Sequence, residues 1–169
     1  MDSNENASDA AFRELARDLG KVEPDKIEFF LSCKKFKMEI DLRLESFYHQ
    51  FNLSPGRFHI LLILRCAPEF ALSPSELAEK TGVSRASMTQ FLDALEKAGY
   101  VSRKDFPGDR RATLIQISTE GLKTLNQEIL PIYFKRCAHF SSICTKAEMK
   151  QFMEMYEKIS KNLSQLEGD

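Results

Sequence analysis

A short run of polar side chains, with one arginine among them, is the part of this sequence best suited to hydrogen-bond chemistry. Its members are Ser84, Arg85, Ser87, Thr89 and Gln90. Hydroxyl, amide and guanidinium groups of these types read base edges and phosphates in the major groove of DNA. On a helix Ala86 would lie among them, and its small side chain would let that face approach another surface closely. The run therefore predicts a surface that contacts nucleic acid.

A second set of charged residues follows a Pro-Gly turn. Asp109, Arg110 and Arg111 come directly after Pro107 and Gly108. An arginine at the tip of a hairpin can enter the minor groove, whose negative potential attracts it. We expect Arg111 to take this place, Asp109 to orient it through an ion pair, and Arg110 to meet a phosphate. The Asp-Arg pair is therefore interpreted as an orienting salt bridge and not as a catalytic pair.

Two helices with a glycine turn between them must position the first set. The run Ser73-Pro74-Ser75-Glu76 is typical of a helix start, with a serine cap, a proline at the first position and a glutamate that reaches back to the cap. Gly82 breaks this helix, because glycine adopts backbone conformations that other residues resist. Ser84 then caps a second helix, which we expect to run to about Ala98 and to stop at Gly99.

The second helix has one apolar face and one polar face. The apolar residues recur one turn apart, which predicts a buried stripe: Met88, Phe91, Leu92 and Leu95. The opposite face carries the polar run together with Asp93 and Lys97. Two strands follow, at residues 100–105 and 112–117, with the charged turn between them. Helix, turn, helix and hairpin make a helix-turn-helix with a wing.

These segments resemble the MarR family of bacterial and archaeal transcription regulators. The resemblance covers about residues 53–121, and Phe106 departs from it, since an acidic or polar residue before the proline is commoner in the family. The matching runs are Leu72-Ser73-x-x-Glu76-Leu77-Ala78, then Val83-Ser84-Arg85 through Leu95-Glu96-x-x-Gly99-Tyr100-Val101, then Asp109-Arg110-Arg111, and finally Ile117-Ser118-Thr119-Glu120-Gly121.

The resemblance implies a mainly α fold with a small β-hairpin wing (α+β) and a homodimer that binds double-stranded, pseudo-palindromic operator DNA. We expect a cytoplasmic transcription regulator, a repressor and not an enzyme. The expected organisation is residues 1–52 for N-terminal dimerisation helices and part of a ligand cleft, 53–117 for the winged helix-turn-helix, and 118–169 for C-terminal dimerisation helices. Two-fold symmetry would place the two recognition helices about 34 Å apart, one helical turn of DNA.

The distribution of charged residues favours attraction to DNA at one part of the chain and not by the chain as a whole. The formal net charge is −1, so the chain lacks the basic character of proteins that bind nucleic acid without sequence preference. Basic residues outnumber acidic ones between residues 84 and 111, whereas the first 25 residues are acidic. We find no phosphate-binding loop, nucleophile motif, zinc-protease motif or CxxC spacing, and so expect neither a cofactor nor a metal.

The flanking segments are rich in apolar residues that need partners. A long helix from Pro24 to about Phe51 carries several aromatic side chains, and another runs from Thr145 to the C-terminus with an apolar seam at alternating gaps of three and four residues. The seam members are Met149, Phe152, Tyr156, Ile159, Leu163 and Leu166. We expect them to pack against a second subunit, with packing on the chain's own helices as the alternative.

Two questions of regulation stay open in the sequence. A small aromatic or lipophilic effector could bind beside the aromatic helix, with walls made by Phe36, Ile40, Phe58 and His59. Alternatively, oxidation of Cys33 could be the trigger, although a cysteine on an apolar helix face is most often simply buried. A further alternative is a winged helix that binds protein instead of DNA, which the near-zero net charge permits.

Overall fold

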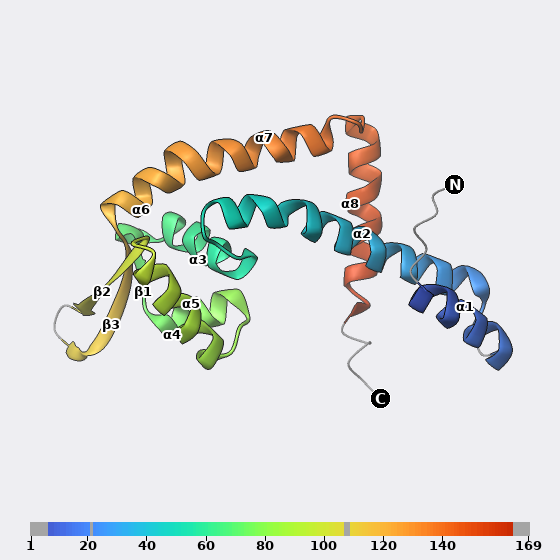
Figure 1. The fold of residues 1–169 in the computed structure, drawn as a ribbon, viewed down its shortest axis with the longest axis horizontal. Helices are drawn as coiled ribbons and strands as arrows, with labels where there is room; N and C mark the ends of the chain where they lie inside the picture. The colour runs from blue at the N-terminus through green and yellow to red at the C-terminus, as the bar shows by residue number, and fades with distance from the viewer. Residues whose placement is uncertain (1–6, 21, 107–108, 164–169) are drawn as a thin grey trace. The chain divides into compact units, whose positions relative to one another are not determined.

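The computed structural model describes residues 7–20, 22–106 and 109–163, and gives the backbone alone at residues 7–8, 106 and 109–112. The chain forms two compact units, residues 1–58 and 59–169. Figure 1 shows the order of the elements along the chain. No helix among the described residues is long and apolar enough to cross a membrane.

The first unit is a helical hairpin followed by the start of a third helix. It contains α1 (Ala7–Leu19), α2 (Pro24–Gln50) and the first turn of α3 (Pro55–Cys66). Arg13 of α1 pairs with Glu28 of α2, with 2.7 Å between Nε and Oε2. At the other end of α2, Phe47 is fully buried and its ring meets those of Tyr48 and Phe58 edge-on at 5.3 and 5.8 Å. The predicted long aromatic helix is confirmed within one residue at its C-terminal end.

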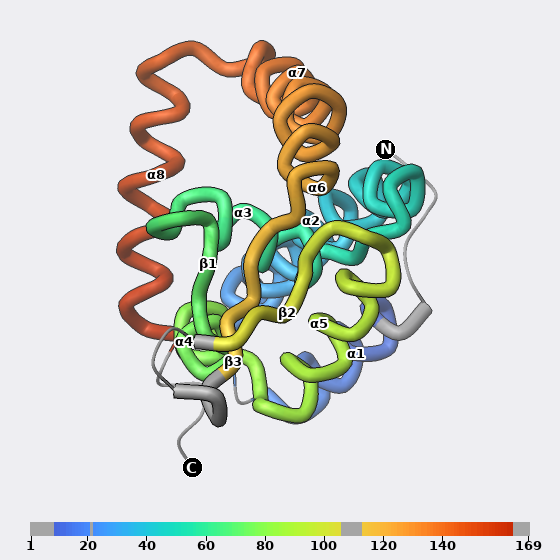
Figure 2. Tube along the Cα trace, turned by 90° about the vertical axis from the view of Figure 1, so that its left-hand side faces the viewer, coloured from blue at the N-terminus to red at the C-terminus, as the bar shows by residue number. Residues whose placement is uncertain are grey.

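The second unit holds a small helical body and a three-stranded sheet. Before its C-terminal helices this unit contains the rest of α3, η1 (Pro68–Phe70), β1 (Ala71–Leu72), α4 (Pro74–Thr81), α5 (Arg85–Lys97), β2 (Val101–Phe106) and β3 (Asp109–Ile117). The sheet is antiparallel with the order β1-β3-β2, as Figure 2 shows. In register, Ile115 faces Leu72 on one side and Arg103 on the other. The two predicted strands are confirmed, while β1 was not expected, since two residues are too short to leave a pattern.

The expected start and stop signals of α4 and α5 are all present. Ser73 and Glu76 form a capping box, in which the Ser73 backbone N–H donates to Oε2 of Glu76 at 2.8 Å. Gly82 has φ 68° and Gly99 has φ 78°, the left-handed region in which only glycine is unstrained. Four apolar side chains of these two helices are almost completely buried and belong to the core together with Ile115 of the sheet: Leu77, Met88, Leu92 and Leu95. The predicted stripe on the second helix is therefore confirmed, with Phe91 at its half-buried edge.

A long helical segment follows the sheet and contains a π turn. It is made of α6 (Thr119–Thr124), the π turn η2 (Leu125–Ile129) and α7 (Leu130–Ser141). The Leu130 N–H donates to the carbonyl oxygen of Leu125, five residues earlier. Pro131 lies just after the π turn, and a proline has no N–H to donate to the carbonyl four residues back. Arg65 of α3 donates from Nε to Oδ1 of Asn126 in the π turn at 3.0 Å.

The last helix is α8 (Lys146–Ser160), which begins at the expected place with a capping box of Thr145 and Glu148. None of its residues is buried. Of the predicted seam, Phe152 is 56% and Tyr156 is 54% exposed and Ile159 is half-buried, while Leu166 lies outside the described residues. A seam of this kind, left open to water, is a surface that needs a partner.

Candidate nucleic-acid interface

Helix α5 presents the predicted polar run on its open side. Arg85, Ala86, Thr89 and Gln90 are exposed and Ser87 is half-buried, while Met88 points into the core with 1% of its surface exposed. The amphipathic pattern of the helix separates the two faces in this way. The structure therefore brings the five predicted residues together at the N-terminal half of one helix, at its edge and on its open face.

The first two serines of the run also stabilise the start of the helix. Ser84 is the N-cap and accepts the N–H of Ser87 at 3.2 Å, and the two hydroxyl oxygens lie 2.9 Å apart. Thr89 donates its hydroxyl proton to the carbonyl of Arg85 at 3.1 Å. The oxygen of Thr89 thus presents lone pairs to the outside and acts as an acceptor, which suits base amino groups.

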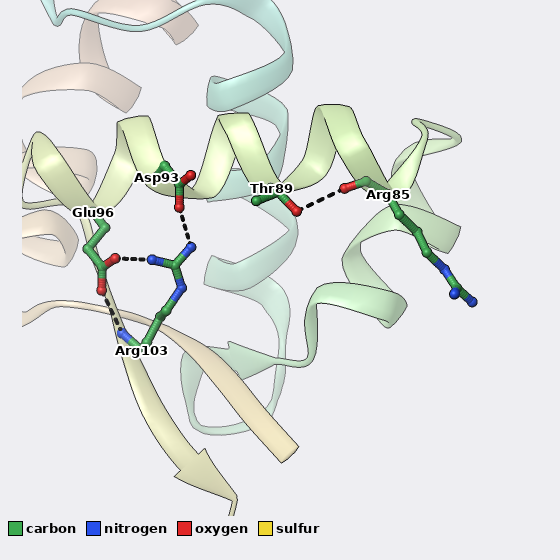
Figure 3. A network of polar contacts seen from close by, with 5 residues as sticks. All are labelled: Arg85, Thr89, Asp93, Glu96 and Arg103. Carbon is green, nitrogen blue, oxygen red and sulfur yellow. Dashed lines mark hydrogen bonds and ion pairs between the residues drawn. The ribbon is translucent and has the colours of Figure 1, made fainter. Parts of the chain in front are cut away.

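Arg85 places a positive charge at the N-terminal end of this face, and its side chain points outward. Figure 3 shows its guanidinium extending away from the start of α5, at the opposite end of the helix from the other charged residues. No ion pair joins it to another side chain in the described ranges. An exposed guanidinium carries five donors in a planar fork that matches phosphate or guanine.

A three-residue charge network lies at the other end of α5. Asp93 and Glu96 of α5 both pair with the guanidinium of Arg103, which lies on β2 (Figure 3). The distance from Nη2 of Arg103 to Oδ1 of Asp93 is 2.5 Å. The hydrogen bond to Asp93 raises the pKa of Arg103, with the nearby charge of Glu96 adding to it against the opposing effect of burial. Sequence reasoning missed this network and counted Arg103 only as part of a basic region. Two acids three residues apart on the helix, with an arginine early in the next strand, are the signal that could have found it.

The wing is a hairpin of β2 and β3. Arg103 pairs with Ile115 across the two strands, and the register shifts between Asp105 and Phe106. The backbone of residues 109–111 belongs to β3. The side chains of Asp109, Arg110 and Arg111 lie outside the described residues, so their expected contacts stay predictions.

Three comparisons with known proteins bear on this geometry. The sequence profile of the MarR family matches residues 53–113. The HTH-type transcriptional repressor YetL of Bacillus subtilis is 31% identical over 151 residues, which cover 89% of this chain and 90% of YetL. This chain belongs to the MarR family.

Solved structures share the fold of this MarR-family chain. Sco3205, a MarR family regulator of Streptomyces coelicolor solved in complex with DNA, superposes with a TM-score of 0.74 at 19% identity, over 84% of this chain and 89% of that one. A mutant MarR of E. coli complexed with operator DNA superposes with a TM-score of 0.67 at 21% identity, over 80% of this chain and 95% of that one. The expected family and fold are confirmed, and the chain is a MarR-type transcription regulator and not an enzyme.

The four residues named for an effector site of this MarR-family chain have different surroundings. Phe36 is 42% exposed, Ile40 is half-buried and Phe58 is buried against other aromatic rings, all in the first unit, while His59 is exposed and begins the second. A hollow of about 1300 Å³ also opens in the first unit, and none of these four residues lines it. Its walls include Lys34, Met38, Leu42, Tyr48, Leu53 and Arg57. The effector residues stay a prediction.

The cysteines lie on exposed residues of the described chain, and Cys137 hydrogen-bonds with Tyr133. Cys33, Cys66, Cys137 and Cys144 are all free thiols on exposed residues. The simple expectation for Cys33 was burial as a small apolar side chain, and the protomer does not provide that burial. Its redox role stays a prediction.

Proposed function

We propose that this MarR-family protein is a homodimeric repressor that binds a pseudo-palindromic DNA operator and acts in the cytoplasm. The observation that carries the proposal is the open polar face of α5, whose opposite face forms the core of a winged helix-turn-helix. That face offers an arginine, an amide and a hydroxyl oxygen within about two helical turns. The solved relatives that share this fold include complexes with DNA. Residues 53–117 would be the DNA-binding domain.

The exposed apolar surfaces support a second copy of the chain as the partner. Leu42 of α2 is 69% exposed and Leu163, just after α8, is 49% exposed. Burying one such side chain is worth about 1.5–3 kcal/mol, so several together favour association strongly. Residues 1–52 and 118–169 would form the dimer. In a symmetric dimer the two α5 helices would enter successive major grooves, about 34 Å apart.

Selection from random duplexes, followed by binding measurements on the selected sequence, tests the proposal. The wild-type protein is expected to enrich a sequence with two-fold symmetry. Arg85→Gln is expected to weaken binding to it by about 1–3 kcal/mol, because one groove or phosphate contact is lost. Lys123→Gln is the matched control, since it removes one positive charge from an exposed pair with Glu120 on α6. Recovery of no preferred sequence, or equal binding by Arg85→Gln and wild type, would overturn the assignment and favour a protein partner.

Sedimentation of two variants tests the dimer. Leu163→Asp places a charge in the apolar seam and is expected to shift the protein to monomer at concentrations where the wild type is dimeric. Asn162→Asp makes the same charge change at the neighbouring exposed position and should leave the dimer intact. A dimeric Leu163→Asp variant would refute the seam as the interface.

We further propose that a small aromatic or lipophilic effector releases the DNA. The aromatic content of α2, which exceeds what the Phe47 cluster uses, supports this, with Phe36, Ile40, Phe58 and His59 as the residues to test. An effector can act only through different affinities for the DNA-binding and the released arrangements. Phenolic acids that neither raise the melting temperature nor release operator would argue against it. The alternative trigger is oxidation of Cys33, which is tested by following DNA binding after peroxide treatment of the wild type and of Cys33→Ser. Only an oxidation trigger would be lost in the Cys33→Ser variant.

A further inference from the structure

The guanidinium of Arg103 holds two carboxylates of the recognition helix at once. Nη2 lies 2.5 Å from Oδ1 of Asp93, and Nη1 pairs with Oε2 of Glu96. The backbone N–H of Arg103 also donates to Oε1 of Glu96, at 3.3 Å. Both the main chain and the side chain of this one residue are therefore attached to α5 (Figure 3). All three residues belong to the unit of residues 59–169.

These contacts join α5, which has the polar face, to β2, the first strand of the wing. Asp93 and Glu96 are three residues apart on α5, and Arg103 is the third residue of β2, the first strand of the hairpin. A planar guanidinium can donate to two carboxylates in a fixed geometry, whereas a lysine ammonium is a single point charge on a flexible stem. The orientation of the hairpin relative to α5 is thus restrained at the base of the wing by a fork that only arginine supplies.

The same contact controls the charge of the open face. Asp93 lies one turn from Gln90 and its side chain is 58% exposed. Two unpaired carboxylates there would repel phosphate groups over a distance comparable to the Debye length, which is about 8 Å at physiological salt. Arg103 offsets one of the two charges and orients both groups. Because its donors are engaged by these acids, the guanidinium is directed at the protein and not outward like that of Arg85.

On the basis of the proposed DNA-binding function, we propose that Arg103 is a positioning residue that fixes the wing relative to the recognition helix and thereby couples reading of the two grooves. It does so without touching DNA. The wing would meet the flank of each half-site while α5 reads its centre. Loss of the restraint would leave the centre readable and make the protein insensitive to the sequence of the flank.

The test compares three duplexes and four proteins. The first duplex is the sequence that the wild-type protein selects from a random pool, the second keeps its centre but exchanges A·T and G·C pairs in the flanks, and the third keeps the flanks but changes the centre. The wild type is expected to lose about tenfold in affinity on the second duplex, the size of one lost groove contact. Arg103→Gln and Arg103→Lys are expected to lose less than about threefold between the first two, while still rejecting a changed centre. Lys123→Gln, the charge-matched control, should behave like the wild type.

A fifth protein, with two substitutions, separates positioning from direct contact. Asp93→Asn combined with Glu96→Gln keeps Arg103 but removes both of its ion pairs with α5. This double variant is expected to lose flank discrimination as Arg103→Gln does. If Arg103 touched phosphate instead, this double variant would bind more tightly with its flank discrimination kept. Direct contact would also lower the slope of log affinity against log salt by about one in Arg103→Gln, with recovery in Arg103→Lys.

The outcomes also separate this inference from the proposed function. Wild-type flank discrimination in both Arg103 variants, in proteins whose melting temperatures show them folded, overturns the inference alone. Evidence that Arg103 contacts phosphate directly, from the double variant or from the salt dependence, overturns the inference as well. A wild-type protein that selects no sequence overturns the proposed function and this inference together.

Discussion

Gly121 lies where the first turn of α6 passes the junction between the recognition helix and the wing. A Cβ atom at this position would lie 2.2 Å from the carbonyl oxygen of Tyr100 and 2.9 Å from its carbonyl carbon. The neighbour is backbone and not the flexible end of a side chain, so relief requires a displacement of roughly 1 Å to reach ordinary contact distance. Gly121→Ala must therefore move the chain at Tyr100, three residues after the end of α5.

That movement would disturb hydrogen bonds that close the junction. The Tyr100 carbonyl accepts the N–H of Ser118 at 3.0 Å. The Ser118 hydroxyl donates to the carbonyl of Gly99 at 2.6 Å and accepts the N–H of Gly121 at 2.8 Å. Overpacking of this kind costs about 1–3 kcal/mol, and weakening one of these hydrogen bonds adds about 0.5–1.5 kcal/mol. We expect Gly121→Ala to lower the free energy of unfolding by roughly 2–4 kcal/mol, which is a fall in melting temperature of roughly 5–15 °C for a chain of this size.

The direction of the stability change tests the reasoning, because helix propensity alone predicts that Gly121→Ala would stabilise the protein. Replacing an unconstrained helical glycine by alanine stabilises a protein by about 0.5–1 kcal/mol. Urea and thermal unfolding of Gly121→Ala should be compared with Thr119→Ala, an exposed position in the same helical turn that should stay within about 0.5 kcal/mol of the wild type. An unfolding midpoint for Gly121→Ala at or above that of the wild type would refute the close approach of the two backbones.

Three further predictions rest on single residues of the same domain. Arg111→Ala is expected to weaken operator binding by about 1–3 kcal/mol at fixed salt in a gel shift, and unchanged binding would remove the wing from the interface. Gly99→Ala should cost about 1–2 kcal/mol in urea unfolding because of its left-handed backbone, with Gly99→Asn costing less. The pKa of Glu76 is held below its usual 4.5 by the hydroxyl of Ser73 and then by the Ser73 N–H. The capping box therefore contributes its stability above that value and loses it as pH falls through the lower folded-state pKa, so Ser73→Ala should raise the pKa of Glu76 in a carboxyl-carbon NMR titration.

The order of elements in the winged domain could be predicted because its signals are local. Ser73, Gly82, Ser84 and Gly99 each fix a boundary through contacts within a few residues, and the stripe around Met88 fixes the buried face of α5. Strand β1 could not be predicted, since its two residues are held only by pairing with a strand more than forty residues later in the chain. The Arg103 network has the same origin, because its members come together only once β2 folds back against α5.

This difference between local and long-range signals changes the interpretation of charge at the DNA face. From the sequence, Arg103 counts as one of the bases that attract DNA, and Asp93 and Glu96 count as acids that oppose it. In the structure the three form one network, so they contribute little to long-range attraction, and Arg85 and the exposed Lys97 are the cations of α5 that lie outside it. The salt-dependent attraction to DNA grows with the number of phosphates that a protein neutralises, so a face with few free cations contributes little to it. Discrimination between DNA sequences then depends on hydrogen bonds and shape. A net charge of −1 is therefore compatible with sequence-specific binding, and weak binding to unrelated duplexes at physiological salt is the behaviour that this distribution of charge predicts.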